Sequence, residues 1–328
     1  WHGWTPTDLI FPFFLFIMGV AIPLALGRRL ARGESRRAIW GHIARRTLIL
    51  FALGLFLNGF PHFDLSRIRI PGVLQRIALC YFFAALIALK TKVRGQVLTA
   101  VALLAVYWLL MKLVPVPGYG AGVLEKEGNL AAYLDNALLH GHLYRPTWDP
   151  EGLLSTIPAI STTLFGVVTA HWLTSPRTAR EKVLGLIGAG IVGVALGQVM
   201  NLWFPINKNL WTSSYAVFTA GMAWLCLAAC FWMVEVKGIR RPFVPFLIFG
   251  MNAITVFVLS GLVARILSLW KIARPDGVAI SVKAYIYETF FASWAGPWRG
   301  SLLFALAYVA FWLAPMGLLY RKRVFLRI

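Results

Sequence analysis

Long apolar runs are the feature that most constrains how this chain can fold. A helix needs about 20 apolar residues to cross the hydrocarbon core of a bilayer. Nine runs of about that length occur, at residues 8–27, 44–60, 72–90, 95–114, 152–174, 182–203, 211–234, 243–269 and 299–320. The chain is also 59% hydrophobic and only 13% charged, which is more apolar surface than a globular core of this length could bury. We therefore expect an all-α, polytopic integral membrane helix bundle with about nine spans.

Two parts of the chain leave the number of spans open. Residues 282–295, VKAYIYETFFASWA, are apolar but short and charged. We interpret them as an interfacial or re-entrant segment, with a tenth crossing at this place as the main alternative. The chain begins at Trp1 without the basic start of a signal peptide. We therefore expect an N-terminal truncation with one more helix upstream, which would bring the total to ten, and treat residues 1–328 as one transmembrane domain.

The distribution of charge predicts the orientation in the membrane. The formal net charge is +20, and the basic residues gather in alternate loops, as the preference of Lys and Arg for the cytoplasmic side requires. These groups lie at residues 28–46, 90–94, 177–182, 237–241 and 321–327. Most acidic residues fall on the other side, namely Asp8, Asp64, Glu125, Glu127, Asp135, Asp149, Glu151, Asp276 and Glu288. We expect Trp1 outside, Ile328 in the cytoplasm, and no nucleic-acid partner.

The segment at residues 115–151 is the longest one expected to lie outside the membrane. It starts with the turn-rich VPVPGYGAG and ends in HGHLYRPTWDPEG. Loops of this length are usually functional or disordered. Its aromatic and acidic residues favour an ordered, extracytoplasmic lid.

Polar residues inside the apolar runs gather toward the predicted outer side. Ionisable groups at membrane depth are costly, so each calls for a partner or a function. The set comprises Thr5, Thr7, Asp8, Asn58, Gln75, Arg76, Ser155, Thr156, Ser161, Thr162, Thr163, Gln198, Asn201, Thr212, Ser213, Ser214 and Tyr215. Together they predict a polar cavity open to the outside, with Asn252 at its floor. The alternatives are that the hydroxyls bond to their own backbone or hold neighbouring helices together, and that Asp8 and Arg76 are structural counter-ions.

Three patterns are interpreted as structural. The run Gly-Ala-Gly-Ile-Val-Gly at residues 188–193 fits a dinucleotide-binding pattern but lies inside a span, which favours close helix packing. His140 and His142 lack further ligand spacing, so we expect no metal site. The three cysteines, at positions 80, 226 and 230, lie in apolar runs and are interpreted as small buried hydrophobic residues.

Several unusual stretches occur together in one order along the chain. They are WHGWTPTDLIFPFFLFIMG (1–19), RIRIPGVLQR (67–76), HLYRPTWDPEGLLSTI (142–157), FPINKNLWTSSY (204–215), GMNAIT (250–255) and the tail RKRVFLRI. In these stretches the chain resembles the heparan-alpha-glucosaminide N-acetyltransferase family and its bacterial amino-sugar acetyltransferase relatives. The resemblance implies a transmembrane acyltransferase that moves acetyl from cytoplasmic acetyl-CoA to the amino group of a glucosamine-type sugar or glycan on the periplasmic or luminal side.

The resemblance also implies roles for particular residues. The essential histidine of the family is expected just upstream of Trp1, and the role is not transferred to the neighbouring His2. Asp8 is the catalytic candidate in this chain, as the group that would orient or stabilise that imidazole. Arg45 and Arg46 are candidates for the phosphates of acetyl-CoA, against the alternative that they serve topology and lipid headgroups. The candidates for binding the acceptor are Arg76, Asp149, Glu151, Asn207, Lys208, Asn209 and Asn252.

Two other functions remain open at this point. A sugar or oligosaccharide permease would also need a polar cavity between helices, and an inactive scaffold would keep the same motifs. The lack of a large luminal insert favours a bacterial inner membrane over a lysosomal one. Homo-oligomers are compatible with this sequence.

Overall fold

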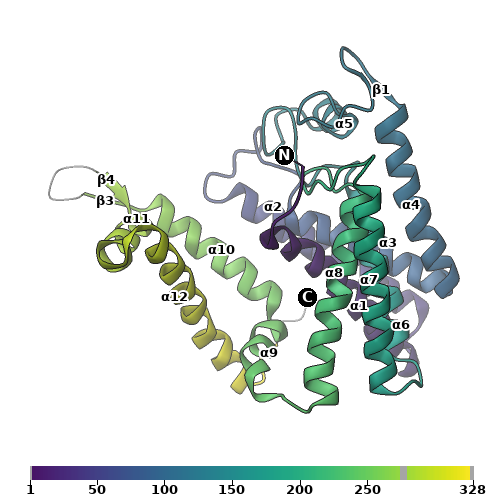
Figure 1. The fold of residues 1–328 in the computed structure, drawn as a ribbon. Helices are drawn as coiled ribbons and strands as arrows, with labels where there is room; N and C mark the ends of the chain where they lie inside the picture. Colours follow the sequence, from purple (N-terminus) through teal and green to yellow (C-terminus); the bar gives the residue numbers. More distant parts are fainter. Residues whose placement is uncertain (1, 274–278, 326–328) are drawn as a thin grey trace. The chain divides into compact units, whose positions relative to one another are not determined.

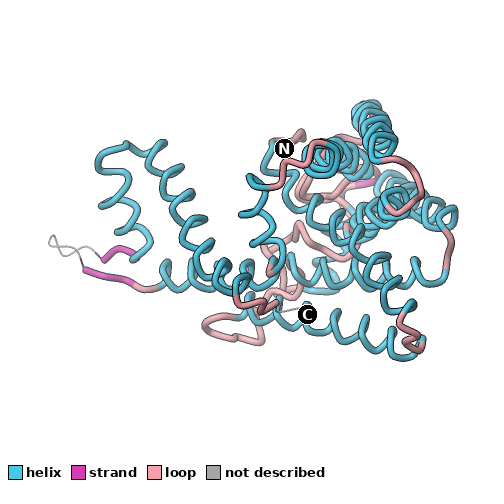
Figure 2. The backbone as a smooth tube through the Cα atoms, turned by 90° about the horizontal axis from the view of Figure 1, so that it is seen from below, coloured by secondary structure: helices cyan, strands magenta, loops and turns pink. Residues whose placement is uncertain are grey.

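The computed structural model describes residues 2–273 and 279–325 of the 328-residue chain. Its described residues form two compact units, Trp1–Gly238 and Ile239–Ile328 (Figure 1). Helices dominate both, and the strands found in the described part are confined to two short hairpins (Figure 2). Each unit is described by itself below. The treatment of residues 1–328 as one domain stays a prediction.

The first unit is built almost entirely from long apolar helices. They are the 3-10 helix η1 (Pro6–Leu9), α1 (Ile10–Ala31), α2 (Arg36–Gly59), α3 (Val73–Lys90), α4 (Val93–Leu113), α5 (Leu130–Leu139), α6 (Thr156–Leu173), α7 (Ala179–Met200), α8 (Ser213–Phe231) and the π-helical turn η2 (Trp232–Val236). The strands β1 (Pro115–Val116) and β2 (Gly120–Ala121) pair in antiparallel register.

The second unit contains a bent pair of helices and a helical hairpin. Its elements are η3 (Arg241–Phe243), α9 (Val244–Met251), α10 (Ala253–Leu269), the antiparallel strands β3 (Lys271–Ala273) and β4 (Ala279–Ser281), α11 (Val282–Tyr287), the π-helical turn η4 (Glu288–Ala292) and α12 (Ser293–Arg321). The pair α9 and α10 is bent by 74° at Asn252.

The predicted fold class is confirmed. Within the described ranges, eight helical stretches are long and apolar enough to cross a membrane, and the bent pair α9 and α10 would make nine. Many of their large apolar side chains face outward; for example, Leu98 and Leu184 are 69% and 67% exposed. Such surfaces suit helices that contact lipid on one side. The chain is therefore an all-α, polytopic helix bundle.

Helix starts follow local capping chemistry. Ser35 caps α2 by accepting a hydrogen bond from the Ala38 amide (3.2 Å), and α7 begins with a capping box in which Thr178 and Glu181 satisfy each other's backbone amides. Because α2 begins at Arg36, it is longer than the expected run at residues 44–60. Arg45 and Arg46 therefore lie inside a helix and not in the preceding loop.

Small residues set the closest helix contacts in the first unit. A Cβ atom added at Gly19 of α1 would lie 2.0 Å from the Thr163 carbonyl oxygen of α6, and one added at Gly166 would lie 2.0 Å from the Phe16 carbonyl oxygen. Helices α7 and α8 approach in the same way at Gly193 and Gly221. Helix packing thus explains Gly190 and Gly193, as the sequence indicated, whereas Gly188 has open space around it.

Residues 282–295 form a separate helical arm. The arm ends at Gly296, whose positive φ of 73° breaks the helix. It folds back on the following part of α12, since the Tyr287 hydroxyl donates to the Pro297 carbonyl (2.9 Å) and the Phe291 and Phe304 rings are 5.5 Å apart. A re-entrant or interfacial position for this arm stays a prediction.

Candidate functional site

A cavity of about 500 Å³ lies where three distant segments of the first unit meet. We call it the Trp148 pocket. Its lining residues are His2, Leu124, Glu125, Lys126, Glu127, Asn129, Ala131, Ala132, Trp148, Asp149, Asn207, Asn209 and Leu210. Its size is within the range of small-molecule sites. The segments that form it carry three of the family-like stretches, which are up to about 200 residues apart in sequence.

The first wall comes from the segment at residues 115–151, which is folded. Asn129 caps α5 by accepting from the Ala132 amide (2.8 Å), and its side-chain amide donates to the carbonyls of Glu125 (2.6 Å) and Lys126 (3.1 Å). These bonds hold the turn that brings Glu125 and Glu127 to the pocket. The Lys126 ammonium lies 5.9 Å from the Trp148 ring centre, within the range of a cation–π contact.

The second wall is the loop between α7 and α8. Asn207 organises it, because its backbone amide donates to the Thr212 hydroxyl (3.1 Å) and its side-chain oxygen accepts from the Leu210 amide (3.1 Å). Thr212 also caps α8. The loop is thus tied at both ends, and Asn207 and Asn209 line the pocket.

The N-terminal segment is tied to this second wall. The Gly3 amide donates to the Ile206 carbonyl (2.8 Å), and His2 Nδ1 lies 3.3 Å from Asn207 Nδ2. Asp8 pairs with Lys208, with 3.1 Å between Oδ1 and Nζ, while its other oxygen accepts from the Thr5 amide and hydroxyl (both 2.9 Å). Asp8 therefore does not line the pocket but holds the segment that carries His2 into it.

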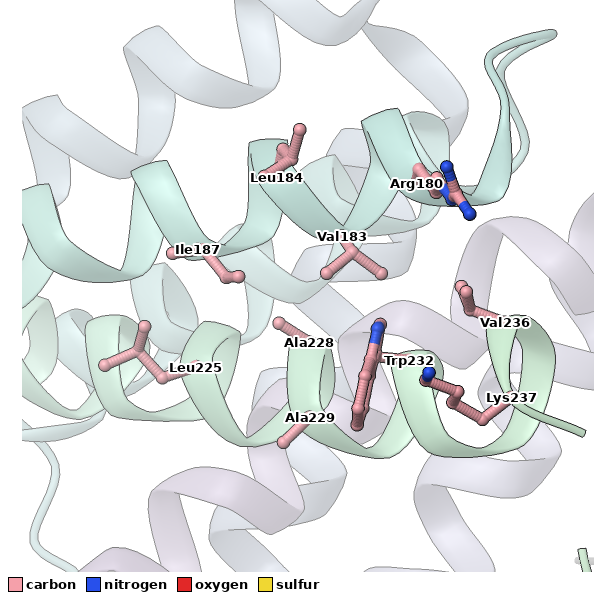
Figure 3. A pocket seen from close by; sticks show the side chains of 10 residues that line it. All are labelled: Arg180, Val183, Leu184, Ile187, Leu225, Ala228, Ala229, Trp232, Val236 and Lys237. Atoms are coloured by element: carbon pink, nitrogen blue, oxygen red, sulfur yellow. The ribbon is translucent and has the colours of Figure 1, made fainter. Parts of the chain in front are cut away.

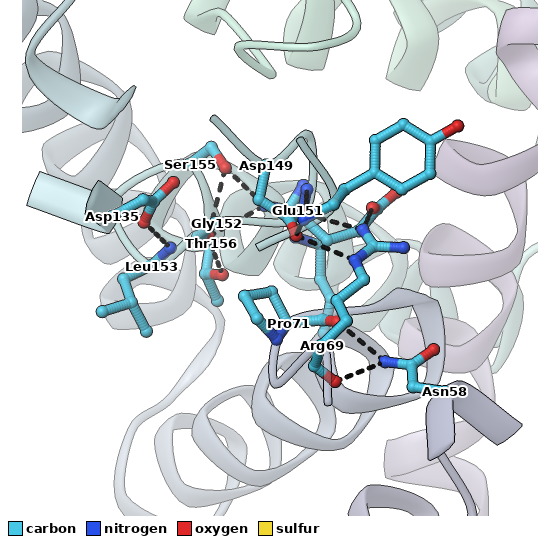
Figure 4. Close-up of polar contacts among 12 residues, drawn as sticks. Asn58, Arg69, Pro71, Asp135, Asp149, Glu151, Gly152, Leu153, Ser155 and Thr156 are labelled. Atoms are coloured by element: carbon cyan, nitrogen blue, oxygen red, sulfur yellow. Dashed lines mark hydrogen bonds and ion pairs between the residues drawn. The ribbon is translucent and has the colours of Figure 1, made fainter. Parts of the chain in front are cut away.

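Asp149 and Glu151 share one cation, Arg69 (Figure 4). Arg69 forms a bidentate pair with Asp149 (2.8 and 2.6 Å) and also contacts Glu151. Burial disfavours the charge on Arg69, but these two carboxylates outweigh it and hold the pKa of Arg69 above its usual value. Asp149 also accepts from the amides of Tyr144 (2.8 Å) and Glu151 (2.9 Å), so its two oxygens accept four hydrogen bonds.

Arg76 is fully buried behind this cluster. It donates to the Gly152 carbonyl (3.0 Å) and to the Ser155 hydroxyl, and its guanidinium lies 5.2 Å from the Trp211 ring centre. The Asp8–Arg76 pairing considered from the sequence does not occur, since Asp8 is paired with Lys208. Arg76 supports the Gly152 turn that follows Asp149 and does not line the pocket.

Asp135 of α5 packs against the same turn from the other side (Figure 4). It accepts from the Leu153 amide (2.8 Å), and a Cβ atom added at Gly152 would lie 1.7 Å from its second oxygen, which has no hydrogen-bond partner among the described atoms. Burial raises the pKa of Asp135 to about 7, the nearby Asp149 charge adds to this, and the Leu153 bond opposes it.

The remaining candidates lie elsewhere. In α2, Arg46 lies 4.6 Å from the Tyr81 ring centre, with Arg45 beside it. Asn58 lies twelve positions after Arg46 in the same helix and donates a hydrogen bond to the Arg69 carbonyl (2.8 Å). Arg46 and Asn58 are therefore about 18 Å apart along the helix. Asn252 belongs to the second unit, where it is 2% exposed and donates to the Val324 carbonyl (3.2 Å).

The polar residues inside the spans do not line the Trp148 pocket. Their hydroxyls bond mainly to backbone carbonyls. Ser161 of α6 donates to the Ala100 carbonyl of α4 (3.0 Å), and Thr162 and Thr163 donate to carbonyls four residues earlier in α6 (3.4 and 3.3 Å). This is the structural alternative stated from the sequence. The Trp148 pocket is built from connecting segments, and the polar cavity that these span residues were expected to line stays a prediction.

Sequence reasoning missed several residues of the site. Trp148 lies within a stretch that was singled out, but its ring was not. Arg69 carried a signal, because a basic residue on the predicted acidic side calls for a partner. Asp135 is the acidic residue of α5, a helix made mostly of apolar residues. In the part of the chain that the structure describes, no cluster of three or more metal-ligating side chains occurs.

Comparisons with known proteins agree with the motifs. Residues 1–119 match the family model "Domain of unknown function (DUF5009)". The chain is 29% identical, over all of its length, to heparan-alpha-glucosaminide N-acetyltransferase of Homo sapiens and to that of Mus musculus. It spans 55% and 56% of those two proteins, about half of their length. The resemblance stated from the motifs is confirmed, and the chain is a relative of these acetyltransferases.

Proposed function

We propose, from the relationship to these acetyltransferases, that the chain is a transmembrane acyltransferase that acetylates the amino group of a glucosamine-type sugar held in the Trp148 pocket. The observation that carries the proposal is the convergence of three family-like stretches on one cavity. These stretches supply His2, then Trp148 and Asp149, then Asn207, Asn209 and Leu210. Acetyl-CoA is the proposed donor, as a co-substrate.

The lining of the pocket suits an amino sugar. The charge of Asp149 is already neutralised by Arg69. The two other acids that line the pocket, Glu125 and Glu127, would therefore supply the negative charge that attracts a cationic amine. The face of Trp148 offers an apolar surface to a sugar ring, with polar groups around it. Asn209 offers an amide for a hydroxyl group, and Asn207 holds the loop that carries it. Asp149 and Glu151 would then have a structural role, because their ion pairs with Arg69 stabilise the wall of the pocket.

The transfer needs a base and a path for the acetyl group. The ammonium of the sugar loses a proton, and the free amine attacks the thioester carbonyl carbon. The nitrogen then gives up a second proton, the carbon–sulfur bond breaks, and CoA leaves as a thiolate that takes up a proton. An imidazole suits the first proton transfer. The histidine expected upstream of Trp1 would belong to the segment that carries His2 to the pocket wall, and Asp8 would position this segment through Lys208.

The donor would approach from the other side of the protein. Arg45 and Arg46 lie about 18 Å along α2 from the end nearest the Arg69 cluster, which supports contact with the CoA phosphates from the cytoplasmic face. The acceptor would then bind on the periplasmic or luminal face. Arg76, Lys208 and Asn252 would act indirectly, by holding backbone and neighbouring side chains. A bacterial inner membrane is the proposed location.

Single-turnover transfer from radiolabelled acetyl-CoA to glucosamine tests the proposal, with full-length protein that includes the upstream residues. Asn209→Ala should slow transfer roughly tenfold through loss of a substrate hydrogen bond. The matched control is Asn136→Ala, which changes an α5 residue outside the pocket lining. Asp8→Asn should lower the rate by loosening the Lys208 contact. No acetylated sugar from the unmodified protein, together with sugar uptake into proteoliposomes without a donor, would replace the acetyltransferase with a permease.

A further inference from the structure

A second cavity, of about 630 Å³, lies between one end of α7 and the end of α8 (Figure 3). We call it the α7/α8 groove. Its lining residues are Arg180, Val183, Leu184, Ile187, Leu225, Ala228, Ala229, Trp232, Val236 and Lys237. The amino-sugar proposal uses none of them. The lining is apolar along the helices and basic at one end, where Figure 3 shows Arg180 and Lys237.

The helix crossing explains the apolar part of the groove. Helices α7 and α8 are pressed together at Gly193 and Gly221, where a Cβ atom added at Gly221 would lie 2.4 Å from the Val194 amide nitrogen. Two helical turns beyond Gly221, the small side chains of Ala228 and Ala229 leave space between Leu225 and Trp232. The groove is therefore part of the helix packing.

A π-helical turn explains the basic end. In η2 the Lys237 amide donates to the Trp232 carbonyl five residues earlier (2.9 Å). This wider turn brings Lys237 back over Trp232, with its ammonium 5.1 Å from the ring centre. Turns of this kind are rare and frequently occur at functional sites. Arg180, in the first turn of α7, faces the same end of the groove.

No described carboxylate forms an ion pair with either cation, Arg180 or Lys237. The adjacent acid Glu181 is engaged by the amide and hydroxyl of Thr178 (both 2.8 Å), and Glu235 does not line the groove. The groove thus combines an apolar channel on two long apolar helices with a positive end, and this charge is complementary to a phosphate.

We propose that the α7/α8 groove binds an anionic phospholipid, with its phosphate between Arg180 and Lys237 and an acyl chain along Leu184, Ile187 and Leu225. Both cations belong to groups whose position predicts the cytoplasmic side, where anionic lipids attract basic residues. The indole of Trp232 lies between the two parts, as is common at the boundary between headgroups and acyl chains. This inference does not depend on the proposed acetyl transfer.

Native mass spectrometry of the full chain, titrated with phosphatidylglycerol or phosphatidylcholine in detergent, tests the proposal. The protein should retain one phosphatidylglycerol in preference to phosphatidylcholine. Arg180→Gln with Lys237→Gln should weaken phosphatidylglycerol binding roughly 30-fold, about fivefold for each cation. The matched control is Lys90→Gln with Lys92→Gln, which removes two charges on the same predicted side and should leave this binding unchanged.

A second variant tests the acyl-chain part without changing charge. Ala229→Leu fills the exposed groove wall and should abolish the preferred lipid while the protein stays monodisperse in gel filtration. Equal weakening in the Lys90/Lys92 control would reduce the effect to general surface charge and overturn the proposal. Unchanged binding in both groove variants would also overturn the proposal, because the lipid would then bind at another place on the protein. Displacement of the lipid by CoA or by inorganic phosphate would assign the cations to a soluble phosphate ligand instead.

Discussion

The buried carboxyl group of Asp135 makes the stability of this protein depend on pH in a direction that can be tested. Its pKa is raised from the ordinary value of 3.8 to about 7 in the folded protein. The folded state therefore holds a proton that the unfolded state has released between about pH 4 and pH 7. Because the folded state binds more protons in this window, the free energy of unfolding falls as pH rises through it.

The size of the effect follows from the shift. A difference of roughly three pH units corresponds to about 4 kcal/mol in total, of which about 2 kcal/mol is lost between pH 5.5 and pH 8.5. For a chain of this size, such a loss would lower the thermal midpoint by roughly 3 °C. Asp135→Asn removes the titration while keeping an oxygen for the Leu153 amide, so its midpoint should fall much less over the same range.

Thermal unfolding in detergent at pH 5.5 and pH 8.5, followed by intrinsic fluorescence, provides the measurement. Asp64→Asn is the matched control: Ser66 and Arg67 hold the pKa of this exposed carboxyl below its usual value. It is ionised throughout the range, and its replacement should leave the pH dependence unchanged. If Asp135→Asn loses as much stability as the unmodified protein on going to pH 8.5, Asp135 does not titrate near neutral pH and the reasoning is refuted.

Two further substitutions test the packing that holds the site. Arg69→Gln leaves the buried Asp149 carboxylate without its cation and should destabilise the protein by about 3–5 kcal/mol. The control, Arg67→Gln, changes an exposed arginine and should have little effect. Equal thermal midpoints for these two variants would contradict this role for Arg69. Gly19→Ala would force a methyl group against a carbonyl oxygen of α6 and should lower the thermal midpoint by several degrees. The control, Gly27→Ala, has open space around the added methyl group and should leave the midpoint unchanged or slightly raised. An unchanged midpoint in Gly19→Ala would mean that α1 and α6 can separate without cost.

Sequence reasoning succeeded where the physical cause is local. The thickness of the bilayer sets the length of an apolar run, so the helices could be counted from residues alone. The glycines at 190 and 193 were correctly interpreted as packing residues. The start of α2 was misplaced, because its capping residue, Ser35, precedes a polar stretch that a count of apolar residues leaves out.

The site was predicted only in part. Asn207, Asn209 and Asp149 were named from motifs and do line one pocket. Asp149 was expected to meet an amine, but its charge is already matched by Arg69, 80 residues away in the sequence. A carboxylate and its partner cation cannot be paired from composition when both lie in irregular loops.

The sequence by itself determined the membrane-spanning class, the number of apolar helices and the kinship with the acetyltransferases, because hydrophobicity, helix length and ordered motifs are properties of contiguous residues. The tertiary structure alone decided which segments share a cavity. His2 meets Asn207 across 205 positions, and the α7/α8 groove exists because glycines set a helix crossing and a π-helical turn redirects Lys237. Such contacts depend on the three-dimensional path of the chain, which no local pattern of residues encodes.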